Sequence, residues 1–453
     1  MTTTTTENAP KSWAEMSPDE RRTARVETWL AAEGVTFASP EAEASYRAGV
    51  LRYRDAVELK KIPDRVPIVM NATFMPADLY DVTPHALLYD PDVLTSTFKR
   101  FLTDYQPDYY FSPAIIGSGQ VLETLDYKQY AWPGHGVAKE SGYQYVEDEY
   151  MATEDYQMLI DDPTDFWLRA FLPRMCGALE PLSRTPALTD VWEIVLVTGH
   201  MIPYGMPDVQ AALAALMEAG RQALAWAEHI GGFEMEVRGM GYVSGAGGIS
   251  KAPFDILADT LRGTKSTMLD MRRRPELVLK AIERLTPLAI KQGLAGANGQ
   301  GNPIVFLPLH KGADGFMSDE QFRTFYWPSL KETVIGLADE GCIPLLFCEG
   351  GYNTRLEYLA ELPKGTTVCL FDRTDMRKAK EVLGGRVCIG GNVPAGMILT
   401  GTADDVRAYC KGLIDDVAPG GGYMMSFGTA MDDGKADTVH AMIDFTKEYG
   451  VYR

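Results

Sequence analysis

The chain has 453 residues and carries 43 lysines and arginines against 62 aspartates and glutamates, a formal net charge of −19 at pH 7. Such a charge repels phosphate backbones and anionic membrane surfaces, so it disfavours a nucleic-acid-binding or membrane-surface protein. The hydrophobic fraction of 46% is ordinary for a globular protein and too high for general disorder. No uncharged apolar run approaches the roughly 20 residues of a membrane span, and the N-terminus lacks the features of a signal peptide.

The six cysteines are too sparse for a disulfide scaffold and form no C-x-x-C pair. Such usage is typical of the reducing cytoplasm, so we predict a cytoplasmic protein. Residues 1–12 are expected to form a disordered tail. We expect residues 13–62 to form a helical N-terminal extension and residues 63–453 to form one main domain.

Two capping signals predict helices in the extension. The run Ser17-Pro18-Asp19-Glu20 combines a capping hydroxyl, a first-turn proline and a glutamate three positions on, which predicts a helix that ends near Gly34. Ser39-Pro40-Glu41 repeats the signal and predicts a second helix to about Lys60. Further along the chain, an alanine-rich stretch predicts a third helix over 207–229.

Short continuous apolar runs predict the strands, at 67–70, 109–111, 303–309, 343–348, 367–371, 386–390 and 422–427. Amphipathic stretches follow the last five runs and predict helices near 318–339, 353–361, 374–383, 402–416 and 434–449. Apolar strands that alternate with helices imply a parallel sheet buried on both faces. A doubly wound sheet would carry a glycine fingerprint after its first strand, and here Asn71-Ala72-Thr73-Phe74 follows instead. We therefore predict an α/β fold, a TIM-like (β/α)8 barrel with a helical extension and a long insertion.

One glycine-rich segment, Arg238 to Gly248, reads RGMGYVSGAGG and is similar to a phosphate-cradling loop. Its spacing is G-x-G-x-x-x-G, however, and the strand and helix that flank such loops are not evident. We therefore expect a flexible active-site loop over these residues.

A polar residue follows each of six predicted strands, and the last two of these residues come after an intervening glycine. In (β/α)8 barrels the chemistry lies at the C-terminal ends of the strands, which converge on one mouth. A single histidine or aspartate after a strand is more often a turn or cap residue, so the prediction rests on the group and not on any member. The predicted site residues are Asn71, His310, Glu349, Asp372, Asn392 and Thr429.

His310 is the most informative of these residues, because an imidazole can be a metal ligand, a general acid or base, or a hydrogen-bond donor to substrate. The alternative is a histidine bonded to a neighbouring backbone group. Strand alternation places Phe347 and Glu349 on one side and Cys348 on the other. If Glu349 faces the mouth, Cys348 packs behind the strand as a small apolar residue.

From about Ala252 to the C-terminus the sequence resembles the uroporphyrinogen decarboxylase superfamily. The matching segments include Leu261-Arg262-Gly263, Trp327-Pro328, Phe371-Asp372, Gly391-Asn392-Val393-Pro394 and Gly420-Gly421-Gly422-Tyr423. The resemblance implies a barrel over residues 63–453, in agreement with the strand pattern. It also implies one of two chemistries, the decarboxylation of a porphyrinogen or the transfer of methyl groups between corrinoids, thiols and folate, as in anaerobic O-demethylation.

Two departures from the superfamily pattern bear on which of these chemistries the chain can perform. True decarboxylases hold the substrate carboxylates with an arginine-rich segment after the first strand, whereas residues 70–76 contain no arginine. Thiol-alkylating members bind zinc through His-x-Cys at one strand end and Gly-Cys at the last. The matching positions here are Phe347, Glu349 and Thr429, so that zinc site cannot form. A harder metal site with His310 and Glu349 as ligands, and metal-free acid catalysis, remain alternatives.

We therefore predict a corrinoid-dependent methyltransferase that moves a methyl group from a small methylated substrate, such as a methyl ether, to a corrinoid, or from a corrinoid to an acceptor. The chain lacks a D-x-H-x-x-G corrinoid signature, so the corrinoid would be carried by a separate partner protein. In this hypothesis His310, Glu349 and Asp372 are catalytic, and Asn71, Asn392 and Thr429 bind substrate. The alternatives are a lyase that decarboxylates a small acid on the same fold and a non-catalytic binding protein. We expect neither a nucleic acid nor a membrane as partner.

Overall fold

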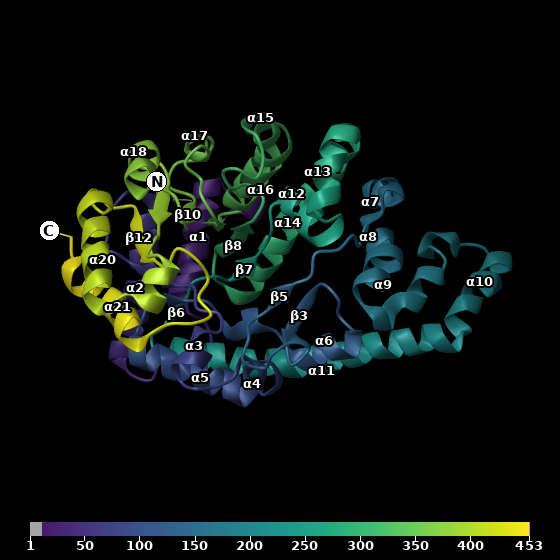
Figure 1. The fold of residues 1–453 in the computed structure, drawn as a ribbon, viewed down its shortest axis with the longest axis horizontal. Coiled ribbons are helices and arrows are strands. Elements are labelled where there is room, and N and C mark those ends of the chain that lie inside the picture. The colour runs from purple at the N-terminus through teal and green to yellow at the C-terminus, as the bar shows by residue number, and fades with distance from the viewer. Residues whose placement is uncertain (1–10, 453) are drawn as a thin grey trace, which may run out of the picture.

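The structure, a computed structural model, describes residues 11–452, so most of the tail predicted over 1–12 lies outside the described residues. Figure 1 shows strands surrounded by helices and, extending away from them, a group of helices along the long helix α11 (Pro207–Gly239). In the part of the chain that the structure describes, none of the helices has the length and apolar character needed to cross a membrane.

Within residues 11–452, nine strands form one sheet in which all neighbours are parallel, in the order β6-β2-β1-β12-β11-β10-β9-β8-β7. The α/β TIM-like fold predicted from the strand pattern is confirmed. The strands are β1 (Ile68–Met70), β2 (Tyr109–Tyr110), β6 (Val243–Ser244), β7 (Gly248–Ile249), β8 (Ile304–Leu309), β9 (Ile343–Cys348), β10 (Val368–Phe371), β11 (Cys388–Gly390) and β12 (Tyr423–Ser426).

Helices return the chain from one strand to the next, as a parallel sheet requires. Those around the sheet are α5 (Pro91–Tyr105), α14 (Pro275–Gln300), α16 (Trp327–Asp339), α17 (Leu356–Leu359), α18 (Met376–Leu383), α20 (Ala403–Val417) and α21 (Ala436–Tyr449). The bounds of β8 to β12 and of the helices between them follow the predicted runs closely, because each strand is a continuous apolar segment.

β6 and β7 are two halves of one interrupted strand. Only residues 245–247 separate them, and the backbone there bonds to both neighbouring strands. The N–H of Gly245 donates to the carbonyl of Tyr110 at 2.7 Å, and the N–H of Gly247 donates to the carbonyl of Ile304 at 2.9 Å. This segment therefore joins β2 to β8 and closes the sheet, and β6 and β7 together supply one of the eight barrel strands. The prediction of a flexible loop over 238–248 is wrong.

The glycines in this strand are required by close backbone contacts. A Cβ on Gly247 would lie 2.1 Å from the carbonyl oxygen of Asn302, and a Cβ on Gly248 would lie 2.5 Å from the carbonyl oxygen of Gly293 in α14. Side chains are thus excluded where the strand passes its neighbours. The apolar pattern that marks the other strands is lost for the same reason.

The helical extension closes the N-terminal end of the barrel. Helices α1 (Pro18–Ala31) and α2 (Pro40–Glu58) form where the capping signals predict them. Tyr53 of α2 packs edge-to-face on Tyr109 of β2, with ring centroids 5.0 Å apart, and the Tyr109 hydroxyl donates to the carbonyl of Gly49 at 2.7 Å. Inward-facing strand residues and helix residues form one buried cluster that includes Trp29, Tyr46, Tyr53, Val57, Val69, Tyr109, Leu345, Leu370 and Met424.

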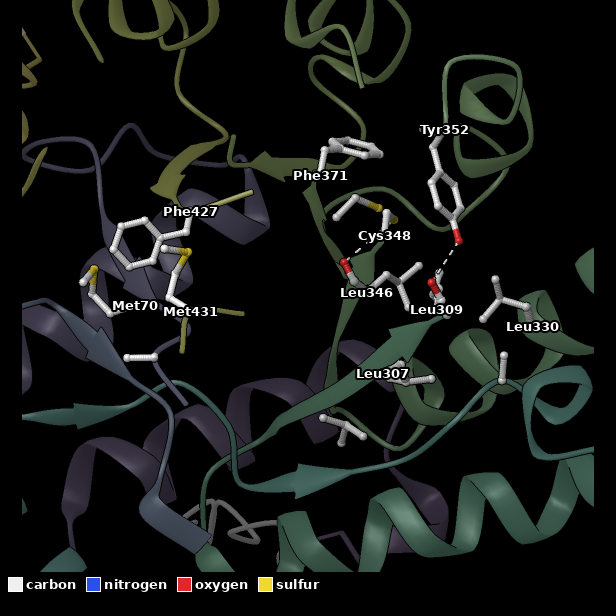
Figure 2. Close-up of a cluster of buried hydrophobic side chains, with 14 of the residues drawn as sticks. Met70, Leu307, Leu309, Leu330, Leu346, Cys348, Tyr352, Phe371, Phe427 and Met431 are labelled. Carbon is white, nitrogen blue, oxygen red and sulfur yellow. Dashed lines mark hydrogen bonds between the residues drawn. The ribbon is translucent and has the colours of Figure 1, made fainter. Parts of the chain in front are cut away.

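The opposite face of each strand packs on the outer helices. Figure 2 shows part of this layer, with Leu309, Leu346, Cys348 and Phe371 among the labelled side chains. Cys348 is fully buried here, behind its strand as predicted. All six cysteines of the chain are free and buried, which fits their expected use as small apolar residues.

A long insertion, residues 113–240, separates β2 from β6. It begins with α6 (Gly119–Leu125) and a small sheet of β3 (Tyr130–Pro133), β4 (Gly136–Val137) and β5 (Gln144–Tyr145). We call the helices that follow, Tyr156–Gly239, the arm: α7 (Tyr156–Asp161), α8 (Pro163–Phe166), α9 (Leu172–Met175), α10 (Ile194–Met201) and α11. The 33 residues of α11 span roughly 50 Å at 1.5 Å per residue. The helix predicted over 207–229 is therefore present, and it continues for ten more residues, to Gly239.

Replacement of Gly247 by alanine is expected to lower the free energy of unfolding by about 1–3 kcal/mol, because the added methyl group meets the Asn302 carbonyl in a packed strand. Gly220→Ala in α11 is the matched control. Nothing lies within 4 Å of its Cβ position, so the change is expected to be neutral or stabilising by about 0.5–1 kcal/mol. Urea unfolding followed by circular dichroism measures both, and equal effects at the two positions would contradict the closed barrel.

Candidate active site

His310 lies between two carboxylates at the C-terminal end of β8. Its Nδ1 is 2.6 Å from Oδ2 of Asp259, and its Nε2 is 3.6 Å from Oε1 of Glu349, which follows β9. The Asp259 side chain is 7% exposed, whereas those of His310 and Glu349 are 30% and 44% exposed. The imidazole therefore has one edge against a buried carboxylate and the other edge at a solvent-accessible mouth.

Two lysines complete the surroundings of Asp259. The Nζ of Lys251 is 2.9 Å from Oδ2 of Asp259, and the Nζ of Lys311 is 3.0 Å from Oδ1. Lys251 stands two residues after β7 and Lys311 two residues after β8. A buried carboxylate is costly unless it is paired and hydrogen-bonded, and here three cationic or hydrogen-bonding side chains surround it.

A second aspartate holds the backbone at the end of β8. Asp255 is fully buried and accepts hydrogen bonds from the N–H groups of His310 and Lys311, at 3.0 and 3.1 Å. The Tyr326 hydroxyl donates to the same carboxylate at 2.8 Å. Asp255 and Asp259 are four residues apart, in α12 (Pro253–Asp255) and the following π-helical turn η8 (Ile256–Leu261), so both project to the same side.

The charges around His310 decide which groups hold protons. Burial alone would lower the pKa of His310, but the hydrogen bond to Asp259 and the charge of Glu349 outweigh it and raise this pKa above its usual value. Burial raises the pKa of Glu349, and neighbouring carboxylates add to the effect against the opposing charge of His310. Burial would also raise the pKa of Asp259, but the His310 hydrogen bond and the charge of Lys251 lower it instead.

The hydrogen bond to Asp259 and these pKa shifts indicate which ring nitrogen of His310 faces the buried carboxylate and which faces the mouth. An ionised Asp259 accepts the Nδ1–H of His310 and stabilises the imidazolium form. The Nε2 atom, beside Glu349 at the mouth, is then the position from which a proton can be given or taken. The arrangement is suited to general acid–base chemistry.

Asp372 belongs to the same mouth. Its Oδ2 accepts the N–H of Gly350 at 3.0 Å, and burial raises the pKa of its carboxyl group. A Cβ on Gly428 would lie 3.2 Å from its Oδ1, so Asp372 is adjacent to the segment that carries half-buried Thr429. The structure thus brings the predicted residues from β8, β9, β10 and β12 together.

The two predicted asparagines are placed differently. Asn71 is 3% exposed at the end of β1 and shares the inward face of Val69. The amide of Asn392 donates to the carbonyls of Asp372 and Thr374, at 2.7 and 2.9 Å, and its oxygen accepts from the Tyr409 hydroxyl at 3.1 Å. The Asn392 amide therefore holds the loop after β10, a positioning role that differs from the predicted contact with substrate.

The small sheet of the insertion is attached to the segment that carries Asp259. We call residues 129–145 the lid. Gln129 Nε2 donates to the carbonyl of Thr260 at 2.9 Å, and the Tyr145 hydroxyl donates to the carbonyl of Asp259. The lid is therefore fixed beside the His310 centre by backbone contacts on η8.

Tyrosines gather on the lid near the charged residues. The ring centroid of Tyr130 is 5.3 Å from that of Tyr145 and 6.1 Å from that of Tyr143. Burial raises the pKa of Tyr130, and the nearby charges of Asp259 and Glu349 add to this effect. Aromatic side chains thus adjoin the acid–base group on the side of the insertion.

Sequence reasoning missed Lys251, Asp255, Asp259 and the lid tyrosines as site residues. The available signal was the pair of aspartates four residues apart after Pro253. It was not used because β7, the strand that precedes them, was not recognised as a strand.

The donor set does not fit the candidate metal site at His310 and Glu349. Nδ1 of His310 is taken by Asp259, and Cys348 lies behind the strand. Catalytic zinc sites use three protein ligands. Between residues 11 and 452, no group of three or more histidine, cysteine, aspartate or glutamate side chains is arranged to hold a metal ion.

A family model described as uroporphyrinogen decarboxylase (URO-D) matches residues 244–449, from the interrupted strand to the last helix. This part of the chain is similar to the uroporphyrinogen decarboxylase family, and the resemblance read from the sequence is confirmed. Among curated proteins, none matches the sequence significantly.

A solved structure with a similar fold supports the barrel architecture. A methyltransferase from Methanosarcina mazei is similar with a TM-score of 0.56 and 13% identity, over 89% of this chain and 98% of that chain. A B12-independent methionine synthase from a Shewanella species gives a TM-score of 0.31 and 10% identity, over 44% of this chain and 59% of that chain. At such identity the first likeness concerns the fold alone.

Asp259→Asn is expected to lower the pKa of His310, because it removes the negative charge that stabilises the imidazolium. NMR titration of histidine side chains, with the His310 signal assigned by its loss in His310→Gln, measures the shift. Asp444→Asn is the matched control, since Oδ2 of Asp444 lies 3.5 Å from Nδ1 of the partly buried His440. An unchanged His310 pKa in Asp259→Asn would contradict the proposed electrostatics.

The raised pKa of His310 also predicts a pH dependence of stability. Folding favours the protonated imidazole, so this contribution is complete below the unfolded-state pKa of about 6.5. It is lost as the pH rises through the higher folded-state pKa of His310. In His310→Gln, urea unfolding between pH 6 and pH 9 is expected to lose this part of the pH dependence, and an unaltered profile would count against it.

Proposed function

We propose that this protein is a methyltransferase that takes a methyl group from a small neutral methylated substrate, such as a methyl ether, and transfers it to a reduced corrinoid delivered by a separate carrier protein. The observation that carries the proposal is the imidazole of His310, held at Nδ1 by buried Asp259 with Nε2 at the mouth. This is a proton donor prepared before substrate binds.

An ether needs such a donor because its oxygen is a poor leaving group. In the proposed reaction the reduced corrinoid, as second substrate, supplies the nucleophile, a bond to the methyl carbon forms and the carbon–oxygen bond breaks. The electron pair stays on the oxygen, which takes the proton from His310 Nε2 and leaves as an alcohol. A positioned acid contributes roughly 10²–10⁴-fold to the rate of such a step.

Two carboxylates have separate parts in this proposal. Asp259 touches neither substrate and acts as a positioning residue, since it orients the imidazole and stabilises its charged form. Glu349 is partly exposed and lies 3.6 Å from Nε2, and the pKa of its carboxyl group is raised. It is therefore suited to return a proton from solvent to His310 after each turnover.

The direction of transfer follows from the protonation state. The raised pKa of His310 favours the acid form, which assists a leaving oxygen. Transfer from the corrinoid to an acceptor would instead need a base to remove the acceptor's proton. We therefore propose demethylation of the substrate as the forward reaction.

Aromatic residues near His310 support an apolar substrate. Phe306 is two positions before Pro308 and four before His310, so the three share the inward face of β8. The ring centroid of Phe306 is 4.9 Å from that of Phe111 and 5.8 Å from that of Phe347. Together with the lid tyrosines, this aromatic row offers apolar surface to the body of the substrate.

The same surroundings weigh against decarboxylation of a small acid, the second candidate. Glu349 and Asp372 stand at the mouth and would repel a carboxylate substrate, while Lys251 and Lys311 are paired with Asp259. A substrate acid would have to displace one of these buried pairs. A neutral substrate meets no such cost.

Mixing the protein with reduced cobalamin and a panel of methyl ethers is expected to produce methylcobalamin, followed by its absorption change. His310→Ala is expected to slow the reaction by roughly 10²–10⁴-fold, and His440→Ala, at a histidine on the last helix α21, is the matched control. Carbon dioxide released from a small acid without a change at cobalt would favour the lyase. Unchanged activity in His310→Ala would contradict the proposed role of His310 as the general acid.

The rate is also expected to depend on pH in a defined direction. Because the acid form of His310 is required, kcat/KM with a methyl ether should fall as the pH rises through the His310 pKa. Asp259→Asn should move this fall to lower pH, and Glu349→Gln should move it in the same direction by less. A pH profile that is identical in wild type and Asp259→Asn would contradict the assigned roles.

A further inference from the structure

The end of the arm exposes a large apolar surface. We call residues 188–206 the arm tip; they include α10 and the short turn η7 (Ile202–Gly205). Helix α10 reads IVLVTGHM and has no buried residue. The most exposed apolar side chains are Ile194 at 89%, Val195 at 81%, Trp192 at 72%, Ile202 at 64% and Leu188 at 62%.

The size of this surface is unusual for a chain that functions alone. Eight large apolar residues of the arm tip are 39–89% exposed. At roughly 200 Å² for each large side chain they present on the order of 1,000 Å², compared with about 300–600 Å² for the largest patch of a typical monomer. A stable protein–protein interface buries about 800 Å² on each partner. One arm tip therefore supplies enough area for a stable contact without any help from the barrel.

The helix itself presents a stripe that suits a close helix pair. Val195, Thr198, Gly199 and Ile202 are spaced i, i+3, i+4 and i+7, so they share one face. Nothing lies within 4 Å of a Cβ placed on Gly199. Small residues thus occupy the middle of the stripe, where two helices could approach closely, and bulky apolar residues stand at both ends.

We propose that the arm tip is the interface between two copies of this chain, paired antiparallel about a two-fold axis near Thr198 and Gly199. Such a pairing sets Val195 of each copy against Ile202 of the other, which is the self-complementarity that a two-fold contact requires. Each copy then contributes the same residues to the interface. The proposal does not depend on the proposed methyl transfer.

The composition of the arm tip favours a second copy over a membrane. Helices that lie on membranes carry lysine and arginine on their polar face, and residues 186–206 contain neither. In the same segment the only acidic or basic residues besides His200 are Asp190 and Glu193. The whole chain has a formal net charge of −19. An anionic lipid surface would repel such a segment.

The position of the arm tip favours a second copy over a carrier protein. A carrier that exchanges a methyl group must reach the strand ends around His310. Figure 1 places α10 at the far end of the arm, away from β8 to β12. Permanent homodimer interfaces are also more apolar than the surfaces of transient partners, and the arm tip has the composition of the former.

Sedimentation velocity on the full chain is expected to give a particle of twice the mass of one chain. Val195→Glu combined with Ile202→Glu is expected to weaken the dimer at least tenfold, because both copies bring charges into the contact. The control Ile62→Glu alters an isoleucine that is 49% exposed outside the arm and should stay dimeric. Circular dichroism of all variants checks that the monomeric form is folded, and a monomeric wild type would overturn the proposal.

Salt and cross-linking test the kind of contact. Because each copy carries a net charge of −19, a tenfold higher salt concentration should strengthen an apolar dimer by screening the repulsion between copies. Dissociation in salt would contradict an apolar contact.

Thr198→Cys places the one accessible thiol beside the axis, since all native cysteines are buried. Oxidised glutathione, which takes up the two electrons, should link Thr198→Cys copies covalently but not Gly299→Cys copies. A monomer that binds phosphatidylglycerol vesicles would instead indicate a membrane contact and overturn the proposal.

Discussion

The buried carboxylate of Asp259 is the group on which the candidate site depends. It binds His310 and Lys311 after β8 and Lys251 after β7, and its backbone carbonyl accepts the hydrogen bond of a lid tyrosine. Removing one partner from a buried charge network leaves an uncompensated charge, which is far more costly than loss of an exposed ion pair. The Asp259 carboxylate thus favours the protonated imidazole and links the ends of two strands, and the backbone carbonyl of the same residue holds the lid.

The position of Asp259 depends in turn on how the barrel closes. The strand before it, β6 with β7, runs so close to its neighbours that a Cβ on Gly247 or Gly248 would clash with backbone atoms. The chain then turns through Asp255 and Asp259 directly over the end of β8. At the opposite end, α1 and α2 fill the barrel with Trp29 and Tyr53, so the accessible opening is the end that carries the charged residues.

The sequence was sufficient for the strands that are continuous apolar segments, and it failed where backbone packing replaced side-chain packing. The run at 343–348 is β9 residue for residue, and the polar residues after β8, β9 and β10 do converge as the barrel topology requires. The two-residue strands β6 and β7 could not be read, because contact with Asn302 and α14 demands glycine where the pattern needs valine or isoleucine. Asp259 was missed with them. Asn392 is a different case, since its partners Thr374 and Tyr409 come from other loops and no local pattern reveals them.

The carboxylates at the mouth of the barrel determine which kind of substrate the site favours. Burial opposes the protonated form of His310, but Asp259, Glu349 and Asp255 outweigh it and raise the His310 pKa. The imidazolium form that this favours assists a substrate that gains a proton as it reacts. The same carboxylates repel an anionic substrate, whereas a neutral ether neither loses solvation of a charge nor displaces a lysine from Asp259. Electrostatics that would hinder a decarboxylase therefore assist a leaving oxygen. Decarboxylation of an acid and transfer of a methyl group from an ether make opposite demands on charge at the mouth, and the groups around His310 favour the proposed methyl transfer.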